Sequence, residues 1–314
     1  MIYNVSHRTD VPAYFWDWWV RRLQAGFFDV RNPKYPERVS RHVLDPETVD
    51  LVSYISKDWR PPLEHDVPIE WVASRWPSWF TFTLNPYGRS LEPNVPSVDE
   101  RVETCAELSA RVGRERVMWT YDPVCMTPDI DVTWHERRLE ELFERLAPHV
   151  SSFGHNYVNL YPKVRANAPE VRRPTPEEQE RLSTLMLKLC HEYGLSTRAC
   201  PNSGLAKLGY PVGACRPFGE ALKANGRERA PRTRPQTMRQ CTICGTIAHR
   251  DVGTYDTCPH LCSYCYANAD QDAVRRTWTA YDPDSTMLCD KLVGDETIEV
   301  PDIVTYSIPK EIRR

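Results

Sequence analysis

Residues 1–200 alternate short apolar segments with longer amphipathic ones, and no other feature restricts the fold as strongly. The apolar segments have the length of β-strands, and the amphipathic ones carry apolar residues at helical spacing, as Leu139, Leu142 and Leu146 do. Strands that alternate with helices in this way are typical of parallel βα units. About six such units predict an α/β fold with a partial (βα)6 barrel of the TIM type, rather than a closed barrel of eight units.

The expected elements follow from this periodicity and from helix start and stop signals. The predicted strands are Ile2–Ser6, Asp50–Ser56, Trp79–Leu84, Arg116–Tyr121, Tyr157–Tyr161 and Leu195–Ala199. The predicted helices are Pro12–Gly26, Val98–Val112, Trp134–Leu146 and Pro176–Tyr193.

Polar residues follow the apolar part of each expected strand. In βα barrels the C-terminal ends of the strands form the active-site face, so we expect catalytic side chains there. The candidates for handling protons or substrate are His7, Tyr87, Asp122 and Lys163. The polarity that all surface loops share is the alternative explanation for any one of them.

The composition excludes several classes of protein. Hydrophobic residues make up 41% of the 314 residues, so the chain can bury a core. The formal charge of −3 implies no general attraction to nucleic acid or to an anionic membrane. There is no run of 18 apolar residues, and the start of the chain lacks a signal-peptide profile. We therefore expect a cytoplasmic protein with no membrane partner.

The chain has eleven cysteines, and their distribution is uneven. A reducing cytoplasm does not need disulfides, so abundant cysteine there indicates metal binding or catalysis. Four scattered cysteines are interpreted as small buried apolar residues: Cys105, Cys125, Cys190 and Cys289. The other seven lie between positions 200 and 265: Cys200, Cys215, Cys241, Cys244, Cys258, Cys262 and Cys265.

Cys258, Cys262 and Cys265 form a CxxxCxxC motif, with Tyr264 directly before the last cysteine. This spacing lets one loop bind three irons of a 4Fe–4S cluster and leaves the fourth iron open. In radical S-adenosylmethionine (SAM) enzymes, SAM fills that position and is cleaved to a carbon radical. A zinc site is the alternative. It would use Cys241 and Cys244 with Cys262 and Cys265, and it would leave Cys258 unused.

The remaining cysteines of the late group are Cys200, Cys215, Cys241 and Cys244. Four thiolates are what a second, fully protein-ligated 4Fe–4S cluster requires. We therefore predict one cluster and a possible second. In the alternatives, Cys241 and Cys244 pair with other ligands, or one of them completes the first cluster.

Three regions are expected along the chain. Residues 1–225 form the partial barrel, and residues 240–314 form a cysteine-rich iron–sulfur module with a tail that packs on the barrel. Between them, residues 226–239 are basic and contain proline, which is typical of an exposed linker. An arm that contacts RNA or DNA is the alternative for this linker.

A family resemblance is carried by the segments Ser6–Tyr14, Arg31–Pro33, Phe82–Gly88, Arg116–Pro123 and Asp251–Asn268. They resemble a bacterial domain family of unknown function, whose C-terminal cysteine cluster is likened to the cluster motif of radical SAM enzymes. The resemblance implies an iron–sulfur protein and no established reaction. That family usually has Cys-Gly-Cys near position 244, whereas this chain has Cys244-Gly245-Thr246.

Two features differ from ordinary radical SAM enzymes. Their cysteine loop follows the first strand, whereas this one follows the predicted barrel, as if the order were permuted. The chain also lacks the Gly-Gly-Glu segment that holds the SAM amino group. If SAM binds, other residues must therefore hold it. Tyr264 is expected to pack beside the cluster. The candidates for SAM binding are Arg8, Asp10, Lys57 and Asn85.

The leading hypothesis is an iron–sulfur enzyme with radical SAM-like chemistry, which needs an external electron donor of the flavodoxin or ferredoxin type. The cysteine–tyrosine loop is similar to that of spore photoproduct lyase, a DNA-repair enzyme, so a nucleic-acid or nucleotide substrate is a minority hypothesis. One alternative is a structural zinc or iron–sulfur module that binds a partner. Another is a non-radical enzyme that uses clusters for electron relay or for Lewis-acid binding of substrate.

Overall fold

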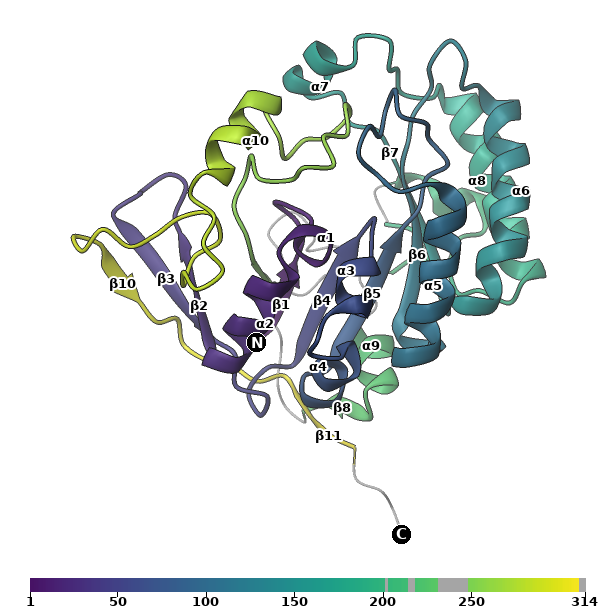
Figure 1. Ribbon diagram of the computed structural model, residues 1–314. Helices are drawn as coiled ribbons and strands as arrows, with labels where there is room; N and C mark the ends of the chain where they lie inside the picture. The colour runs from purple at the N-terminus through teal and green to yellow at the C-terminus, as the bar shows by residue number, and fades with distance from the viewer. Residues whose placement is uncertain (201–202, 214–217, 231–247, 311–314) are drawn as a thin grey trace.

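The computed structural model describes residues 1–200, 203–213, 218–230 and 248–310, and its centre is a parallel six-stranded sheet (Figure 1). The strand order is β7-β6-β5-β4-β1-β9, and every neighbouring pair is parallel. The strands are β1 (Ile2–Val5), β4 (Leu51–Ser56), β5 (Ser78–Thr83), β6 (Val117–Val124), β7 (Ser152–Tyr157) and β9 (Arg250–Asp251).

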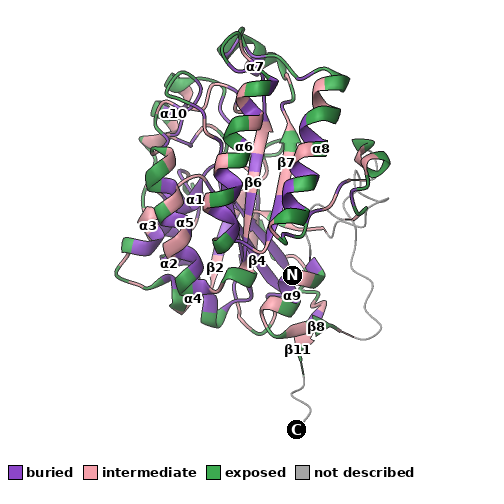
Figure 2. Cartoon of the chain, turned by 90° about the vertical axis from the view of Figure 1, so that its right-hand side faces the viewer, coloured by how far each residue is buried: buried purple, intermediate pink, exposed green. Residues whose placement is uncertain are grey.

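Amphipathic helices pack against this sheet with their apolar faces inward, as Figure 2 shows for α6 and α8. Capping boxes at Ser97 and Thr175 begin α5 and α8, because each side chain accepts a backbone N–H of the first helical turn. The helices are α1 (Val11–Tyr14), α2 (Trp16–Ala25), α3 (Arg60–Glu64), α4 (Ile69–Arg75), α5 (Val98–Val112), α6 (Val132–Leu146), α7 (Pro162–Asn167), α8 (Pro176–Glu192), α9 (Phe218–Ala224) and α10 (Gln271–Trp278).

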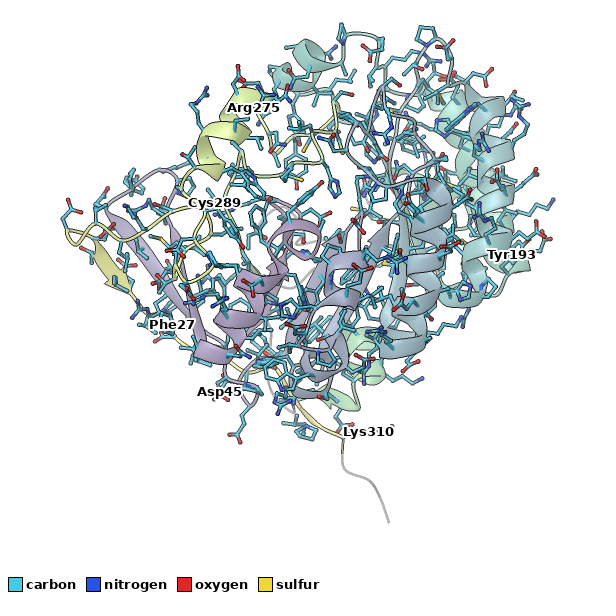
Figure 3. The ribbon with its side chains drawn as sticks, viewed as in Figure 1. Phe27, Asp45, Tyr193, Arg275, Cys289 and Lys310 are labelled. Atoms are coloured by element: carbon cyan, nitrogen blue, oxygen red, sulfur yellow. The ribbon has the colours of Figure 1, made fainter. Side chains whose placement is uncertain are left out.

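The C-terminal segment returns to the N-terminal part of the chain. Around Cys289 it lies against the β2–β3 hairpin, where the Asp29 N–H donates to the Thr286 carbonyl at 2.9 Å (Figure 3). Its short strands complete two small sheets, β10-β3-β2 and β11-β8. These strands are β2 (Phe27–Arg31), β3 (Arg38–Val43), β8 (Arg227–Arg229), β10 (Thr297–Glu299) and β11 (Ser307–Pro309).

The α/β class with a parallel sheet is confirmed, and the described strands form an open sheet without barrel closure. The predicted strand Tyr157–Tyr161 is wrong, because the strand in this region is β7. Leu195–Ala199 makes only isolated bridges, one of them between Ser152 and Ser196. The sixth strand is instead β9, which the sequence did not predict. The predicted helix Pro12–Gly26 is divided at Phe15 into α1 and α2.

The largest side chains of the core are aromatic and lie between the sheet and its helices. Trp18, Trp19, Trp59 and Trp119 are completely buried. Such side chains each remove a large apolar area from water, which makes this layer the main source of hydrophobic stabilisation. Among the described helices, none is both long and apolar enough to cross a lipid bilayer.

We predict that the protein loses stability in mild acid, because buried histidines must stay neutral. His135 Nε2 donates to the Cys125 carbonyl at 2.9 Å, so Nδ1 accepts from the Tyr121 hydroxyl at 2.7 Å. Burial lowers the pKa of His135 and of His42 from 6.5 to about 4. Each neutral side chain therefore adds roughly 3 kcal/mol of stability that is complete above pH 6.5 and is lost as the pH falls towards 4.

Urea unfolding at pH values between about 7.5 and 4.5 measures this effect. His135→Gln should lower stability at neutral pH and reduce the further loss in acid. The control is His191→Gln on the exposed side of α8, which should keep the native pH dependence. An equal acid-induced loss in His135→Gln and in the native protein would show that this histidine is not responsible.

Candidate functional site

The CxxxCxxC loop begins at the C-terminal end of an edge strand of the sheet. β9 pairs with β1, with Asn4 opposite Asp251, and the chain runs from β9 directly towards Cys258. Because all six strands are parallel, their C-terminal ends lie along the same edge of the sheet. The loop therefore lies at the edge where the sequence predicted the chemistry. It also contacts the end of α7, where Asn167 Nδ2 donates to the Ala269 carbonyl at 2.9 Å (Figure 1).

Cys258, Cys262 and Cys265 are free thiols that belong to one tight loop. The Cys265 N–H donates to the Cys262 carbonyl at 3.0 Å, and Leu261 has a left-handed φ of 53°, which is uncommon for a non-glycine residue. Cys258 is buried and the other two cysteines are half-buried. Burial raises the pKa of Cys258 and of Cys262 well above that of an exposed thiol. The thiolates therefore need positive charge or a metal to become stable.

The spacing of the three sulfur atoms distinguishes between kinds of metal site. One tetrahedral zinc ion, with Zn–S bonds of about 2.3 Å, brings its sulfur ligands to within about 3.8 Å of one another. Among the described residues, the only histidine, cysteine or carboxylate group with all ligand atoms within 4.8 Å of one another is His7, His249 and Asp251. At least one pair of the three motif sulfurs is therefore farther apart than one tetrahedral ion allows, whereas the zinc alternative with Cys241 and Cys244 lies partly outside the described residues.

Hydrogen bonds from both sides fix the loop backbone. Asn94 Nδ2 donates to the Pro259 carbonyl at 2.8 Å, and Asn268 Nδ2 donates to the Cys258 carbonyl at 2.8 Å. The Ser263 N–H donates to the Leu91 carbonyl at 3.0 Å. The loop is thus held against the segment that follows β5.

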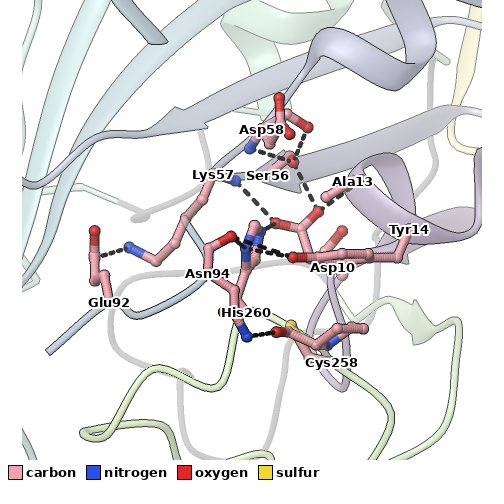
Figure 4. Close-up of polar contacts among 12 residues, drawn as sticks. Asp10, Ala13, Tyr14, Ser56, Lys57, Asp58, Glu92, Asn94, Cys258 and His260 are labelled. Carbon is pink, nitrogen blue, oxygen red and sulfur yellow. Dashed lines mark hydrogen bonds and ion pairs between the residues drawn. The ribbon is translucent and has the colours of Figure 1, made fainter. Parts of the chain in front are cut away.

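His260 lies inside the motif and joins the loop to the sheet (Figure 4). Its Nε2 contacts the Asp10 carboxylate at 3.0 Å, and its Nδ1 contacts the Tyr14 hydroxyl at 3.0 Å. Since a carboxylate only accepts, His260 Nε2 donates to Asp10. Asp10 also accepts from Ser56 Oγ at 2.7 Å and from the Lys57 N–H at 2.9 Å. One buried carboxylate therefore connects the start of α1, the end of β4 and the cysteine loop.

A second buried group surrounds Glu92. Lys57 Nζ lies 2.8 Å from Glu92 Oε1, Arg101 Nη1 lies 3.6 Å from Oε2, and the Tyr264 hydroxyl donates to Oε1. Burial opposes ionisation of Glu92, but the charges of Lys57 and Arg101 outweigh it and lower its pKa. Burial likewise opposes the charge of Lys57, but Glu92 and Cys262 raise its pKa. The Lys57 charge favours the thiolate of Cys262, and the Glu92 charge opposes it.

Asn85, Tyr87 and Asp122 lie together at the ends of β5 and β6. Asn85 Nδ2 and the Tyr87 hydroxyl each donate to the Pro123 carbonyl at 2.8 Å, and Asn85 Oδ1 accepts the Asp122 N–H at 3.1 Å. Both side chains are thus used to hold the backbone of β6. The Asp122 carboxylate accepts from Asn156 Nδ2 at 2.8 Å, and burial raises its pKa. A carboxyl group with a raised pKa is suited to proton transfer.

The structure places the other predicted residues around this centre. His7 Nδ1 lies 2.8 Å from Asp251 Oδ1. Arg8 Nη1 donates to the Gly253 carbonyl at 3.3 Å, and its guanidinium lies 5.5 Å from the centre of the Tyr255 ring. Lys163 is on α7 and makes no hydrogen bond or ion pair with the other site residues that the structure describes.

The predicted ligands of a second cluster can be placed only in part. Cys200 is a half-buried free thiol just after the bridge at Ala199. Cys215, Cys241 and Cys244 lie outside the described residues. The second cluster therefore stays a prediction.

Sequence reasoning missed Glu92, His260, Tyr14 and Arg101. His260 had a signal, since it lies within the motif as Cys258-Pro259-His260. Glu92 had none, because its partners Lys57 and Tyr264 are distant in the chain and only the fold brings them together.

A family of known proteins is similar to nearly the whole chain. The family model described as Domain of unknown function (DUF1848) matches residues 2–267. No curated protein and no solved structure matches the chain. The match covers every strand of the central sheet and the whole CxxxCxxC motif.

We predict that Glu92→Gln strongly destabilises the protein. The substitution leaves the buried cations of Lys57 and Arg101 without their anion, and breaking a buried ion pair in this way costs about 3–5 kcal/mol. The measurement is the free energy of unfolding in urea. The matched control is Glu141→Gln, because Glu141 pairs with Arg138 and Arg145 on the surface, where less than about 1 kcal/mol is expected. Equal losses in the two variants would contradict a charged buried cluster.

Proposed function

The chain belongs to the family of the domain of unknown function DUF1848, and from its site we propose that it is an iron–sulfur enzyme of the radical SAM type. Cys258, Cys262 and Cys265 hold a 4Fe–4S cluster with one open iron. The observation that carries the proposal is the position of the CxxxCxxC loop, which leaves the C-terminal end of an edge strand in a parallel α/β sheet.

The order of the strands in space supports this function. In radical SAM enzymes the cysteine loop follows the first strand of the barrel. In this chain the loop follows a late strand, β9, yet β9 lies at the edge of the sheet beside β1. Read from that edge, the order is β9-β1-β4-β5-β6-β7, and the loop follows the first strand in space. We propose that the fold is a permuted partial barrel of the (βα)6 TIM type.

The residues of the loop fit a cluster better than a single ion. The three thiols are free and together are too widely spread for one tetrahedral ion, so a zinc site would use at most two of them and leave a third thiol unused. The Ala267 N–H donates to Cys265 Sγ at 3.3 Å, and hydrogen bonds to the sulfurs are one means by which proteins tune such clusters. The charge of Lys57 favours the thiolate of Cys262. When bound, the cluster supplies the electron that cleaves SAM and starts radical chemistry.

The protein residues around the loop have different roles in this proposal. Asp10 and Asn85 use their polar atoms in buried protein contacts, so we assign them to positioning the loop and β6. Lys57 and Arg8 remain the candidates for binding the SAM carboxylate. Lys57 uses one of its three donors on Glu92, and Arg8 Nε is buried without a partner among the described residues.

Asp122 is the best candidate for exchanging a proton with substrate. Its pKa is raised by burial, and it lies at the strand-end edge within the range of the Lys57 charge. His7 and Tyr87 are weaker candidates, because each is engaged with a neighbouring residue, His7 with Asp251 and Tyr87 with Pro123. An external flavodoxin- or ferredoxin-like donor would supply the electron. A nucleotide or nucleic acid is the minority hypothesis for the substrate.

We predict that the anaerobically purified protein is brown, contains iron and sulfide, and produces 5′-deoxyadenosine from SAM under reduction. Cys258→Ala, Cys262→Ala and Cys265→Ala should each lose this product and most of the iron of that cluster. The matched control is Cys105→Ala, which removes a buried thiol of α5 far from the motif in sequence and should keep iron and product. A colourless protein with zinc, or full iron in the three motif variants, would contradict the proposal.

A further inference from the structure

A second group of metal-binding side chains lies at the same edge of the sheet and contains no sulfur. It consists of His7, His249 and Asp251. His7 follows β1, whereas His249 and Asp251 flank Arg250 at β9. Residues two apart in an extended segment point to the same side, so the pairing of β9 with β1 brings all three together.

The distances match those between ligands of one metal ion. Bonds of about 2.0–2.2 Å to nitrogen and oxygen put neighbouring ligand atoms about 2.9–3.5 Å apart. His7 Nδ1 lies 2.8 Å from Asp251 Oδ1, and His249 Nε2 lies 3.6 Å from the same oxygen. One ligand atom from each of the three residues lies within 4.8 Å of the other two. An ion therefore fits between them with small side-chain adjustments.

A buried amide beside the group provides an independent observation. Asn4 is completely buried, and its Nδ2 donates to Asp251 Oδ1 at 3.2 Å. Its Oδ1 is buried without a hydrogen-bond partner among the described residues. A water molecule bound to a metal ion would donate to this oxygen, and hydrogen bonds of that kind orient the ligands of metal sites. An unpaired buried amide oxygen is otherwise costly.

The group is also open to solvent on one side. The side chains of His7 and Asp251 are 33% and 28% exposed, whereas that of His249 is 4% exposed. Two imidazoles and one carboxylate leave coordination positions free, and this set is typical of iron(II) and zinc sites that bind water or substrate. We propose that His7, His249 and Asp251 bind one divalent first-row transition metal ion, separately from the cysteine loop.

The experiment titrates the full-length protein with Co²⁺ after chelator treatment and follows absorption and equilibrium dialysis. We expect one Co²⁺ per chain with the weak visible bands of nitrogen and oxygen ligands, without the intense bands of a cobalt thiolate. His249→Ala and Asp251→Asn should each weaken this binding by about tenfold or more. His191→Ala, an exposed histidine of α8, should leave it unchanged.

Cys262→Ala separates this proposal from the proposed cluster. The Cys262→Ala variant should still bind Co²⁺ at His7, His249 and Asp251. This result is expected whether or not the native protein holds the iron–sulfur cluster, so the two proposals can fail separately. His7→Ala, whose side chain is partly exposed, gives a second ligand variant if Asp251→Asn fails to fold. Two outcomes would overturn the proposal. One is cobalt bands of the thiolate type that vanish in Cys262→Ala. The other is an equal Co²⁺ affinity in the native, His249→Ala and His7→Ala proteins.

Discussion

The buried carboxylate of Asp10 is the contact on which the arrangement of the site depends. It accepts hydrogen bonds from β4 through Ser56 and Lys57, and it holds His260 in the cysteine loop. A buried carboxylate is stable only when its oxygens accept hydrogen bonds. The loop, α1 and β4 supply these hydrogen bonds together, so their relative positions are linked. The same carboxylate caps α1 through the Ala13 N–H. The position of the loop thus depends on the hydrogen bonds to this buried carboxylate as well as on apolar packing.

The Glu92 group shows why the site differs electrostatically from the rest of the core. Most of the buried interior is aromatic or aliphatic, yet Glu92 and Arg101 are charged and buried, and Lys57 pairs with Glu92 near Cys262. Such groups are expensive to bury and add little stability by themselves. Their cost is consistent with a functional role, because the Lys57 cation favours the Cys262 thiolate that a metal or cluster requires. Tyr264 connects this charge to the motif itself.

Local signals in the sequence predicted some elements well and others poorly. α5 was predicted at its observed bounds from its apolar periodicity and from the stop at Gly113, and the structure adds a cap at Ser97. β7 was misplaced, since alternating apolar residues at Val158 and Leu160 pack in the loop after the strand. β9 was missed because it has two polar residues and becomes a strand only by pairing with β1. The cysteine motif was visible because its spacing is local, whereas the charged groups around it are assembled by the fold.

β9 brings a late segment of the chain beside β1, the first strand of the chain, at the edge of the sheet. A strand of two residues contributes little pairing energy of its own, so its position depends on contacts at either end. Before and within it, His249 and Asp251 contact His7, and after it the cysteine loop is fixed by Asp10. Two donor sets, one of nitrogen and oxygen and one of sulfur, thus flank the same strand. The nitrogen–oxygen set and the sulfur set prefer different metals. An ion bound by His7, His249 and Asp251 would hold β9 on β1, and it would thereby keep the thiols of the cysteine loop at the strand-end edge.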